Sequence, residues 1–351
     1  MTLRLLADDL TGALDTAAAF CSAAPVPVHL AAPRAVVADE ALALDLACRD
    51  GSEAAAVAAT LAAAPLLDGA DIAFLKIDSL LRGHWAAMLA ALWRRGSFRS
   101  CVLAPAFPEQ GRVTRGGRQY MRDAEGGLRH VPHDPRAALA VVGVTDVEVR
   151  DAGGEADLRA IVAEGRAVPG PVLWCGTAGL ASALAGAAPP RLTRLPAPAL
   201  TVIGSRHPVT LAQLRALAEA TGAAPMQLCG AAGEAGAVAA RLRRWGCVAL
   251  ADIPPGSTQA AAAARIASVL HATLPRLAPP GTLIAAGGET LRAACEALGV
   301  ARLDVAAVFR PGVPCSRLVG GSWEGVRLVS KSGAFGAPGL LAELFAAVGS
   351  V

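Results

Sequence analysis

The stretch LRLLADDLTGALD, residues 3–15, places a short apolar run directly before a polar turn and an alanine-rich segment. The apolar run at 3–6 predicts a buried strand, and the segment after the turn predicts a helix. The same pattern recurs along the chain, at the predicted strands 72–77, 100–104, 172–175, 200–203, 248–251, 283–286 and 326–330. Repeated strand-helix units predict an α/β fold with a mainly parallel sheet flanked by helices, in which ligands bind beyond the carboxyl ends of the strands.

The chain length and a proline-rich stretch near the middle indicate two domains. The chain has 351 residues, more than one ordinary domain. The proline-rich stretch AAPPRLTRLPAP at 187–198 has no apolar periodicity and separates two sets of strand-helix units. We therefore predict domains at 1–195 and 196–351, each with its own mainly parallel sheet and with the active site in the interdomain cleft. A second irregular stretch, 109–135, is rich in glycine and arginine and is predicted to be a long functional loop.

Composition excludes several classes of protein. The longest apolar run, 54–67, is too short to span a membrane and contains Pro65, and Asp8 and Asp9 interrupt the apolar N-terminus. We expect a soluble, cytoplasmic protein with no membrane partner. A net charge of +3 and a single tyrosine argue against nucleic acid as a partner, whereas a homo-oligomer stays compatible.

The cysteine and histidine pattern predicts no metal site. The eight cysteines contain no C-x-x-C pair, so neither a zinc site nor a disulfide framework is expected, and we interpret them as small buried hydrophobes. His130 and His133 have ligand-like spacing, but Pro132 lies between them and no helix is predicted there.

Two adjacent carboxylates, Asp8 and Asp9, follow the first predicted strand. One of them can orient or deprotonate a substrate hydroxyl. The alternative is that Asp8 or Asp9 only caps the helix that follows.

Charged side chains follow the strand at 72–77 as KIDSLLRG, residues 76–83. Lys76 and Arg82 can hold a substrate carboxylate near Asp78 and Ser79. The alternative is a local ion-pair network that supports the turn. The segment APAFPEQGR, 104–112, ends in Arg112, which suits a second anion clamp as well as an ordinary surface turn.

The second half of the chain offers three glycine turns after predicted strands: GSRH at 204–207, GGET at 287–290 and SKSGAFG at 330–336. Free backbone amides at such turns bind phosphate oxygens, so together they favour a nucleotide. Neither a P-loop G-x-x-x-x-G-K-[ST] nor a G-x-G-x-x-G fingerprint occurs, which argues against a standard dinucleotide site.

With these motifs in order, the sequence resembles the four-carbon acid sugar kinase family, which includes D-threonate, D-erythronate and 3-oxo-tetronate kinases. The matching segments are ADDLTGALD (7–15), KIDSLLRG (76–83), APAFPEQGR (104–112), GSRHPVT (204–210), GGET (287–290), PGVP (311–314) and SKSGAFG (330–336). The resemblance implies an N-terminal acid-sugar domain, a C-terminal ATP-binding domain and transfer of a phosphoryl group to the terminal hydroxyl of the acid. The KIDS form is more similar to the threonate and erythronate kinases.

The resemblance also implies roles for individual residues. Asp8 is expected to be catalytic, although Asp9 is open as an alternative base. The expected substrate-binding residues are Asp9, Lys76, Asp78, Ser79, Arg82 and Arg112. The expected ATP-binding residues are Ser205, Gly287, Gly288, Glu289, Thr290, Lys331 and Gly333. ATP and Mg²⁺ are the implied cofactors, and no protein metal ligand is predicted.

Several positions depart from the family pattern. Leu80, His84, Ala86 and Met88 stand where the family usually has Thr, Asn, Gly and Glu, and His207 replaces a common serine. The chain is also shorter than expected for the family. These departures motivate a second hypothesis, a weakened relative that binds its ligands as a sensor. A dehydrogenase of the same acids is a third.

Overall fold

The computed structural model describes residues 2–33, 35, 37, 40–123, 125–222, 225–245, 247–251, 253 and 256–349, with the backbone alone at 244, 245, 247, 249 and 250. The chain divides into two compact units, Met1–Pro189 (unit 1) and Pro190–Val351 (unit 2). The division falls within the proline-rich stretch 187–198, slightly before the predicted boundary at 195/196.

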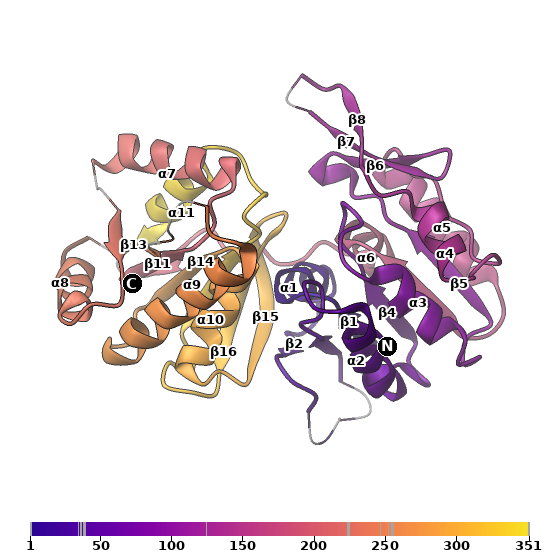
Figure 1. The fold of residues 1–351 in the computed structure, drawn as a ribbon, viewed down its shortest axis with the longest axis horizontal. Helices are drawn as coiled ribbons and strands as arrows, with labels where there is room; N and C mark the ends of the chain where they lie inside the picture. The colour runs from indigo at the N-terminus through magenta and orange to yellow at the C-terminus, as the bar shows by residue number, and fades with distance from the viewer. Residues whose placement is uncertain are drawn as a thin grey trace. The chain divides into compact units, whose positions relative to one another are not determined.

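Unit 1 is built on a parallel sheet with the strand order β2-β3-β1-β4-β9-β5 (Figure 1). Its strands are β1 (Leu3–Ala7), β2 (Val26–His29), β3 (Leu42–Asp45), β4 (Ile72–Lys76), β5 (Ser100–Ala104) and β9 (Val172–Gly176). Each of β1, β4, β5 and β9 lies within a residue or so of its predicted range. The predicted α/β class with a mainly parallel sheet is confirmed.

Helices cover both faces of this sheet. On one face, α2 (Glu53–Ala63), α3 (Trp85–Trp93) and α4 (Pro135–Val141) share a hydrophobic core with alternate residues of the strands, such as Leu75 and Leu173. The remaining helices are α1 (Leu10–Ala19), α5 (Glu155–Ala167) and α6 (Ala178–Ala185), which pack against one another. Gly165 of α5 lies against Trp174, whose side chain points to the opposite face from Leu173.

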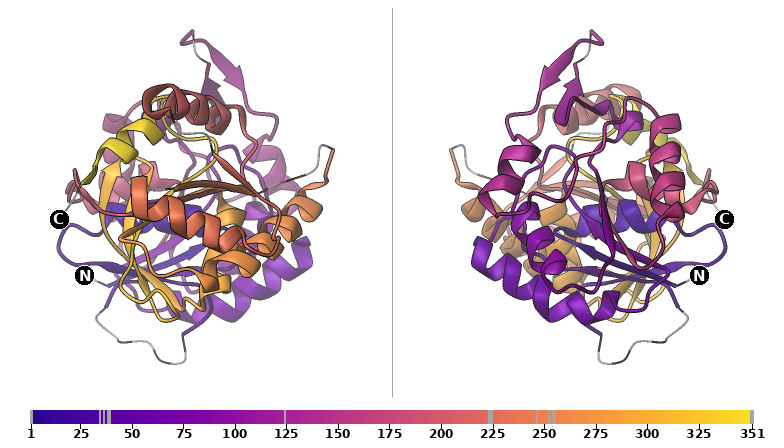
Figure 2. Two further views of the ribbon diagram at one scale, coloured as in Figure 1. Left: turned by 90° about the vertical axis from the view of Figure 1, so that its left-hand side faces the viewer. Right: turned by 90° about the vertical axis from the view of Figure 1, so that its right-hand side faces the viewer.

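The prediction of an irregular loop at 109–135 was wrong. Apart from residue 124, which lies outside the described residues, this stretch forms an antiparallel sheet of β6 (Arg112–Arg115), β7 (Arg118–Arg122) and β8 (Leu128–His130). Gly116 and Gly117 have φ of 58° and 70°, as a two-residue type I′ hairpin turn requires. The strands that they join, RVTR and RQYMR, carry no continuous apolar run that would have predicted them. The β7–β8 hairpin projects from the body of unit 1 in Figures 1 and 2.

Unit 2 has the strand order β12-β13-β11-β14-β17-β16-β15. The first five strands run parallel, and β16 pairs antiparallel with both β17 and β15. The strands are β11 (Ala199–Ile203), β12 (Met226–Leu228), β13 (Cys247–Ala251), β14 (Thr282–Ala286), β15 (Arg302–Arg310), β16 (Val313–Val319) and β17 (Arg327–Lys331), and β10 (Leu195–Pro196) pairs with β18 (Val348–Gly349).

Five helices accompany the sheet of unit 2 in the described residues: α7 (Pro208–Thr221), α8 (Glu234–Trp245), α9 (Gln259–Thr273), α10 (Gly288–Leu298) and α11 (Leu340–Ala346). α7 and α11 share one hydrophobic core with β11, β14 and β17, whereas α9 and α10 pack side by side (Figure 1). The short 3₁₀ segments of the chain are η1 (Ala64–Leu67), η2 (Pro108–Gln110) and η3 (Leu274–Arg276).

Two further features bear on the sequence predictions. Cys229 is exposed, so the interpretation of the cysteines as buried was wrong for this one. Cys101 is partly buried and packs against the hydrophobic core, and the side chain of Cys247 lies outside the described residues. Among the helices that the structure describes, none combines the length and the apolar character needed to cross a bilayer.

Candidate functional site

The polar residues of unit 1 gather where its central strands end. β1 pairs with β3 on one side and β4 on the other, and Ala7 lies in register with both Asp45 and Lys76. The residues that follow these strands therefore emerge at one edge of the sheet, which is where a parallel sheet binds ligands.

Asp8 is held by an arginine that the sequence analysis did not single out. Arg49 Nε lies 2.7 Å from Asp8 Oδ2 and Arg49 Nη2 lies 2.7 Å from Asp8 Oδ1, a two-pronged ion pair. The turn after β3 positions this arginine, because the amides of Cys48 and Arg49 both donate to the Asp8 carbonyl. The Asp8 side chain is 1% exposed, and Arg49 binds both of its oxygens.

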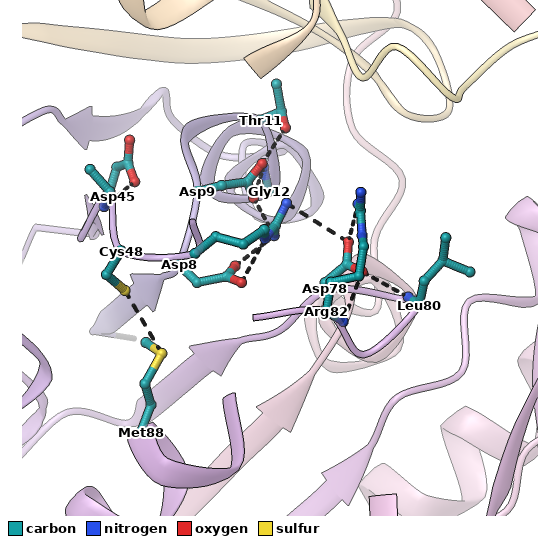
Figure 3. A network of polar contacts seen from close by, with 12 residues as sticks. Asp8, Asp9, Thr11, Gly12, Asp45, Cys48, Asp78, Leu80, Arg82 and Met88 are labelled. Atoms are coloured by element: carbon teal, nitrogen blue, oxygen red, sulfur yellow. Dashed lines mark hydrogen bonds and ion pairs between the residues drawn. The ribbon is translucent and has the colours of Figure 1, made fainter. Parts of the chain in front are cut away.

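Asp9 begins α1 and also binds Arg49. Its Oδ1 accepts from the Gly12 amide at 3.0 Å and from Arg49 Nη2 at 2.6 Å, and its Oδ2 accepts from the Thr11 hydroxyl at 2.6 Å (Figure 3). The helix-capping alternative thus describes Asp9 and not Asp8. With 19% of its side chain exposed, Asp9 is the more accessible of the two carboxylates.

Asp78 and Arg82 form a second two-pronged pair, with Arg82 Nε and Nη2 each 2.8 Å from an Asp78 oxygen (Figure 3). Arg49 Nη1 lies 3.8 Å from Asp78 Oδ1 and so links this pair to Asp8 and Asp9. This is the local ion-pair network that the sequence analysis considered as an alternative. The Arg82 side chain is 55% exposed, so it can still meet a ligand from solvent.

Burial and neighbouring charges shift the pKa values of the carboxyl groups in this cluster in different directions. Burial raises the pKa of Asp8 above its usual value in spite of Arg49. Burial acts on Asp9 and Asp78 too, but Arg49 and Lys76 keep the pKa of Asp9 low, and Arg82 and Arg49 keep the pKa of Asp78 low. Burial raises the pKa of Asp15, on α1, to about 7 despite the opposing charge of Lys76. Lys76 therefore lies within the field of all four carboxylates.

Ser79 and Arg112, also predicted for the acid site, are both buried, and Arg112 lies within the electrostatic field of Asp78 and Arg82. Gln119 of β7 joins their segments, since its Nε2 donates to the carbonyls of Ser79 and Pro105, both at 3.0 Å. Its Oε1 accepts from the Thr114 hydroxyl at 2.7 Å, so this fully buried amide is satisfied at both ends.

Three glycine turns of unit 2 lie together. The Gly204 amide donates to Thr290 Oγ1 at 3.0 Å, and the Gly287 amide donates to the Lys331 carbonyl at 2.9 Å. A Cβ added at Gly333 would lie 2.3 Å from Ser205 Oγ, so the third turn packs directly on the first. The predicted nucleotide residues on these turns are therefore neighbours.

The GGET turn begins a helix. Gly287 is the N-cap of α10 with a φ of 104°, a conformation that favours glycine, and Gly288 is its first residue. Glu289 is exposed in the first turn, and Thr290 is buried. The first amides of α10 have no carbonyl within the helix to bind, which is the arrangement that attracts phosphate.

Lys331 ends β17 and is 2% exposed. Its Nζ has no hydrogen-bond partner among the residues that the structure describes, and burial alone lowers its pKa to about 8. Lys76 and Lys331 are the only lysines in the sequence, and each lies at the carboxyl end of a strand, one in each unit. Burying an ammonium without a counter-charge is energetically costly.

The SKSGAFG turn is tied to α7. Thr210 Oγ1 donates to the Gly333 carbonyl at 2.8 Å, and Gln213 Nε2 lies 3.0 to 3.1 Å from the carbonyls of Phe335, Gly336 and Ala337. Both side chains are fully buried.

Sequence reasoning missed Arg49, Asp15, Gln119 and Gln213. Arg49 had a usable signal, since the run Leu42–Asp45 ends at the same edge as β1 and is followed by a charged turn. Asp15 lay within a quoted motif but carried no spacing signal. The carbonyls to which the two glutamines donate lie 14 to 124 positions away in sequence, so no local pattern could have predicted these contacts.

The departures from the family pattern have structural counterparts. Met88 is buried, and its sulfur lies 3.8 Å from Cys48 Sγ, so this position supplies packing and no charge. The Leu80 amide donates to Asp78, and His84 contacts the Gly51 carbonyl at 2.7 Å. His207 caps α7, with its Nδ1 accepting from the Val209 amide.

Comparison with known proteins agrees with the two units. Residues 3–152 match the family model of a sugar-binding N-terminal domain, and residues 200–341 match that of a nucleotide-binding C-terminal domain. A D-threonate kinase from Cupriavidus necator is 32% identical and aligns with 97% of this chain and 96% of its own length. A D-threonate kinase from Bordetella bronchiseptica is 30% identical, covering 95% and 94%.

A crystal structure of a Salmonella typhimurium LT2 protein shares the fold, with a TM-score of 0.70 at 22% identity and coverage of 97% of this chain and 98% of its own. Both domain models, in this order, and relatives that span nearly the whole chain lead to one assignment. The chain belongs to the four-carbon acid sugar kinase family.

Proposed function

We propose that this protein is an ATP-dependent kinase that phosphorylates the terminal hydroxyl of a four-carbon sugar acid, with D-threonate or D-erythronate as the first candidates and 3-oxo-tetronate as a further one. One observation carries the proposal: a carboxylate-arginine cluster lies at the strand ends of the sugar-binding unit, and phosphate-binding turns lie in the nucleotide-binding unit. D-threonate kinases that align with both units support it.

In unit 1 the sugar acid binds close to the positively charged side chains of Arg82, Arg112 and Lys76. Arg82 and Arg112 bind the substrate carboxylate, and Lys76, Asp78 and Ser79 shape the pocket around it. Asp8 takes the proton from the attacking hydroxyl, since its raised pKa makes it a better proton acceptor than Asp9. Asp9 orients the substrate. Because Arg49 binds both oxygens of Asp8, the substrate hydroxyl has to displace one of these two hydrogen bonds.

In unit 2 the turns at Ser205, Gly287–Thr290 and Gly333 hold ATP, and Lys331 gains the partner that it lacks. Lysine suits this place because a phosphate oxygen can satisfy an ammonium that burial has stripped of water. When bound, Mg²⁺ would neutralise the charge of the phosphates, and no side chain is assigned to it. Transfer requires the acceptor oxygen to approach the γ-phosphate to about 3 Å, so acid and ATP must meet during turnover.

The test is a panel of four-carbon acids, including both threonate and erythronate enantiomers, offered with ATP and Mg²⁺ while ADP release is followed. The position of the phosphate is read from ³¹P NMR, because a phosphate on a CH₂ group is split by two protons. ADP release with one of these acids supports the proposal.

Other outcomes point to the alternatives. Ligand binding in calorimetry without ADP release would indicate the sensor that the replacements at Leu80 and Met88 motivate. Reduction of NAD without a need for ATP would indicate a dehydrogenase. Either result rejects the kinase.

A further inference from the structure

Two buried glutamines, one in each unit, hold the backbone of the segments that carry the proposed binding residues. Gln119 and Gln213 are both fully buried, and neither contributes to a helix cap or a sheet ladder through its side chain. A glutamine amide can donate two hydrogen bonds and accept others, so a buried one fixes the groups around it.

In unit 2, Gln213 faces three consecutive carbonyls, those of Phe335, Gly336 and Ala337. Carbonyl oxygens can only accept, so the NH₂ end of the amide has to face them, and its two N–H donors are shared among the three oxygens. In contrast, Gln213 Oε1 is buried with no partner in the described part of the chain. Burying an unpaired oxygen costs free energy. The side chain therefore keeps the hydrogen bonds of its NH₂ group at the cost of leaving Oε1 without one.

The orientation of the carbonyls determines that of the amides. In a trans peptide unit the N–H points opposite to the C=O. Carbonyls held towards α7 therefore aim the amides of Gly336 and Ala337 away from it, and both residues are exposed. Exposed amides aimed the same way bind phosphate oxygens.

Thr210 strengthens the same connection. It lies three residues before Gln213 on α7, on the same side of the helix, and donates to the carbonyl of Gly333. α7 thus holds the turn at four carbonyls, from Gly333 to Ala337.

In unit 1, Gln119 plays the corresponding part. Its NH₂ group holds the carbonyl of Ser79, in the segment with Lys76 and Arg82, and that of Pro105, in the segment that leads to Arg112. It fixes the separation of the two segments that supply the cations for the substrate carboxylate.

We infer that Gln119 and Gln213 are positioning residues of the proposed reaction, Gln119 for the sugar acid and Gln213 for the nucleotide, although neither touches a reacting atom. This inference rests on the proposed function. It predicts that each glutamine influences the binding of one ligand and leaves the other unchanged.

The experiment measures both KM values, and the dissociation constants of the acid and of a non-hydrolysable ATP analogue by calorimetry, in Gln119→Met and Gln213→Met. Methionine keeps the length of the side chain and removes its donors. Gln213→Met is expected to raise the KM and dissociation constant for nucleotide about fivefold or more, as loss of a hydrogen bond of ordinary strength implies, with the acid constants within about twofold. Gln119→Met is expected to raise the KM and dissociation constant for the acid by a similar factor, with the nucleotide constants within about twofold.

Each variant is the matched control for the other. A merely structural role would lower Tm and change both KM values together, or reduce active protein without changing either, and both results overturn the inference. If Gln213→Met does not fold, Thr210→Val removes the neighbouring bond to the same turn and is expected to raise the nucleotide constants alone. For Gln119 the second variant is Thr114→Val, expected to raise the acid constants alone.

Wild-type protein separates this inference from the proposed function. If the wild-type protein turns over and the variants keep its KM values and dissociation constants, the positioning roles are rejected and the proposed kinase activity stands. Wild-type protein that binds neither ligand rejects the kinase, and the positioning roles with it.

Discussion

Arg49 grips Asp8 at both carboxylate oxygens, with each N···O distance at 2.7 Å. The same guanidinium binds Asp9 and lies 3.8 Å from Asp78, so a single positive charge is shared among three carboxylates of the proposed acid site. Its own burial opposes its charge, but the pKa of Arg49 stays well above its usual value because of Asp9 and Asp8.

We predict that Arg49→Met destabilises the protein by about 3–5 kcal/mol, because it leaves buried carboxylates without their counter-charge. Urea unfolding measures the change. Arg95→Met is the control: its pair with Asp68 is more exposed and is expected to contribute less than about 1 kcal/mol. Equal losses in the two variants would show that Arg49 has no special place in the cluster.

Asp8→Asn is expected to reduce turnover by about a hundredfold or more while the affinity for nucleotide stays within about twofold, because the lost proton acceptor serves the acid and not ATP. Steady-state kinetics and calorimetry measure the two quantities. Asp9→Asn is expected to act mainly on the KM for the acid. The reverse pattern, with turnover lost only in Asp9→Asn, would transfer the role of base to Asp9.

The two lysines are predicted to respond in opposite ways to replacement by methionine at pH 7. Lys331→Met should stabilise the protein, on the order of 1 to 3 kcal/mol, because it removes a buried charge that has no partner among the described residues, while nucleotide affinity falls. Lys76→Met should destabilise it, since four carboxylates lose an attractive charge.

The pH dependence of Lys331→Met follows from the lowered pKa of about 8. Between pH 8 and the ordinary value of 10.5, the unfolded chain holds a proton that the folded protein does not, so wild-type stability gains with rising pH through this range. The advantage of Lys331→Met should therefore shrink between pH 7 and pH 10. A constant advantage, read from thermal melts at each pH, would contradict an unpaired ammonium.

Asp15 gives a second pH signal of opposite direction. Its folded pKa of about 7 exceeds the ordinary 3.8, so between these values the folded protein holds a proton that the unfolded chain has lost, and stability falls as pH rises. We predict that Asp15→Asn raises Tm at pH 8 and leaves it nearly unchanged at pH 4. A gain of the same size at both pH values would mean that Asp15 does not titrate in this window.

Gly333→Ala is predicted to raise the KM for ATP several-fold more than the KM for the acid, because the new Cβ would lie 2.3 Å from Ser205 Oγ. Ser205→Ala removes that oxygen, so the double variant should lose less nucleotide affinity than the sum of the single changes. Gly236→Ala, with open space around its added Cβ, is the control and should change neither constant. Simple additivity would mean that Ser205 and Gly333 do not share a site.

Local pattern was sufficient for the architecture and for eight strands, β1, β4, β5, β9, β11, β13, β14 and β17, because buried parallel strands are continuous apolar runs. It gave no prediction for the parallel strands β2, β3 and β12, which are only three or four residues long. It failed for β6 to β8, β15 and β16, where arginines and other polar residues alternate with apolar ones. Local pattern also identified the segments that form the candidate site, but it did not predict the contacts between them. Asp8 was recognised from its place after β1, but Arg49 is its partner only because β3 lies beside β1 in the sheet.

Because the sequence contains only two lysines, their side chains can serve as NMR probes of ligand binding. Protein grown with lysine labelled by ¹⁵N at Nζ would carry just two side-chain signals, from Lys76 and Lys331. Each of them belongs to a different unit, and each lies at a strand end beside one of the proposed ligand sites. Acid and nucleotide binding could thus be followed separately, in one sample and without a foreign probe, through the two ammonium groups that the ligands are proposed to meet.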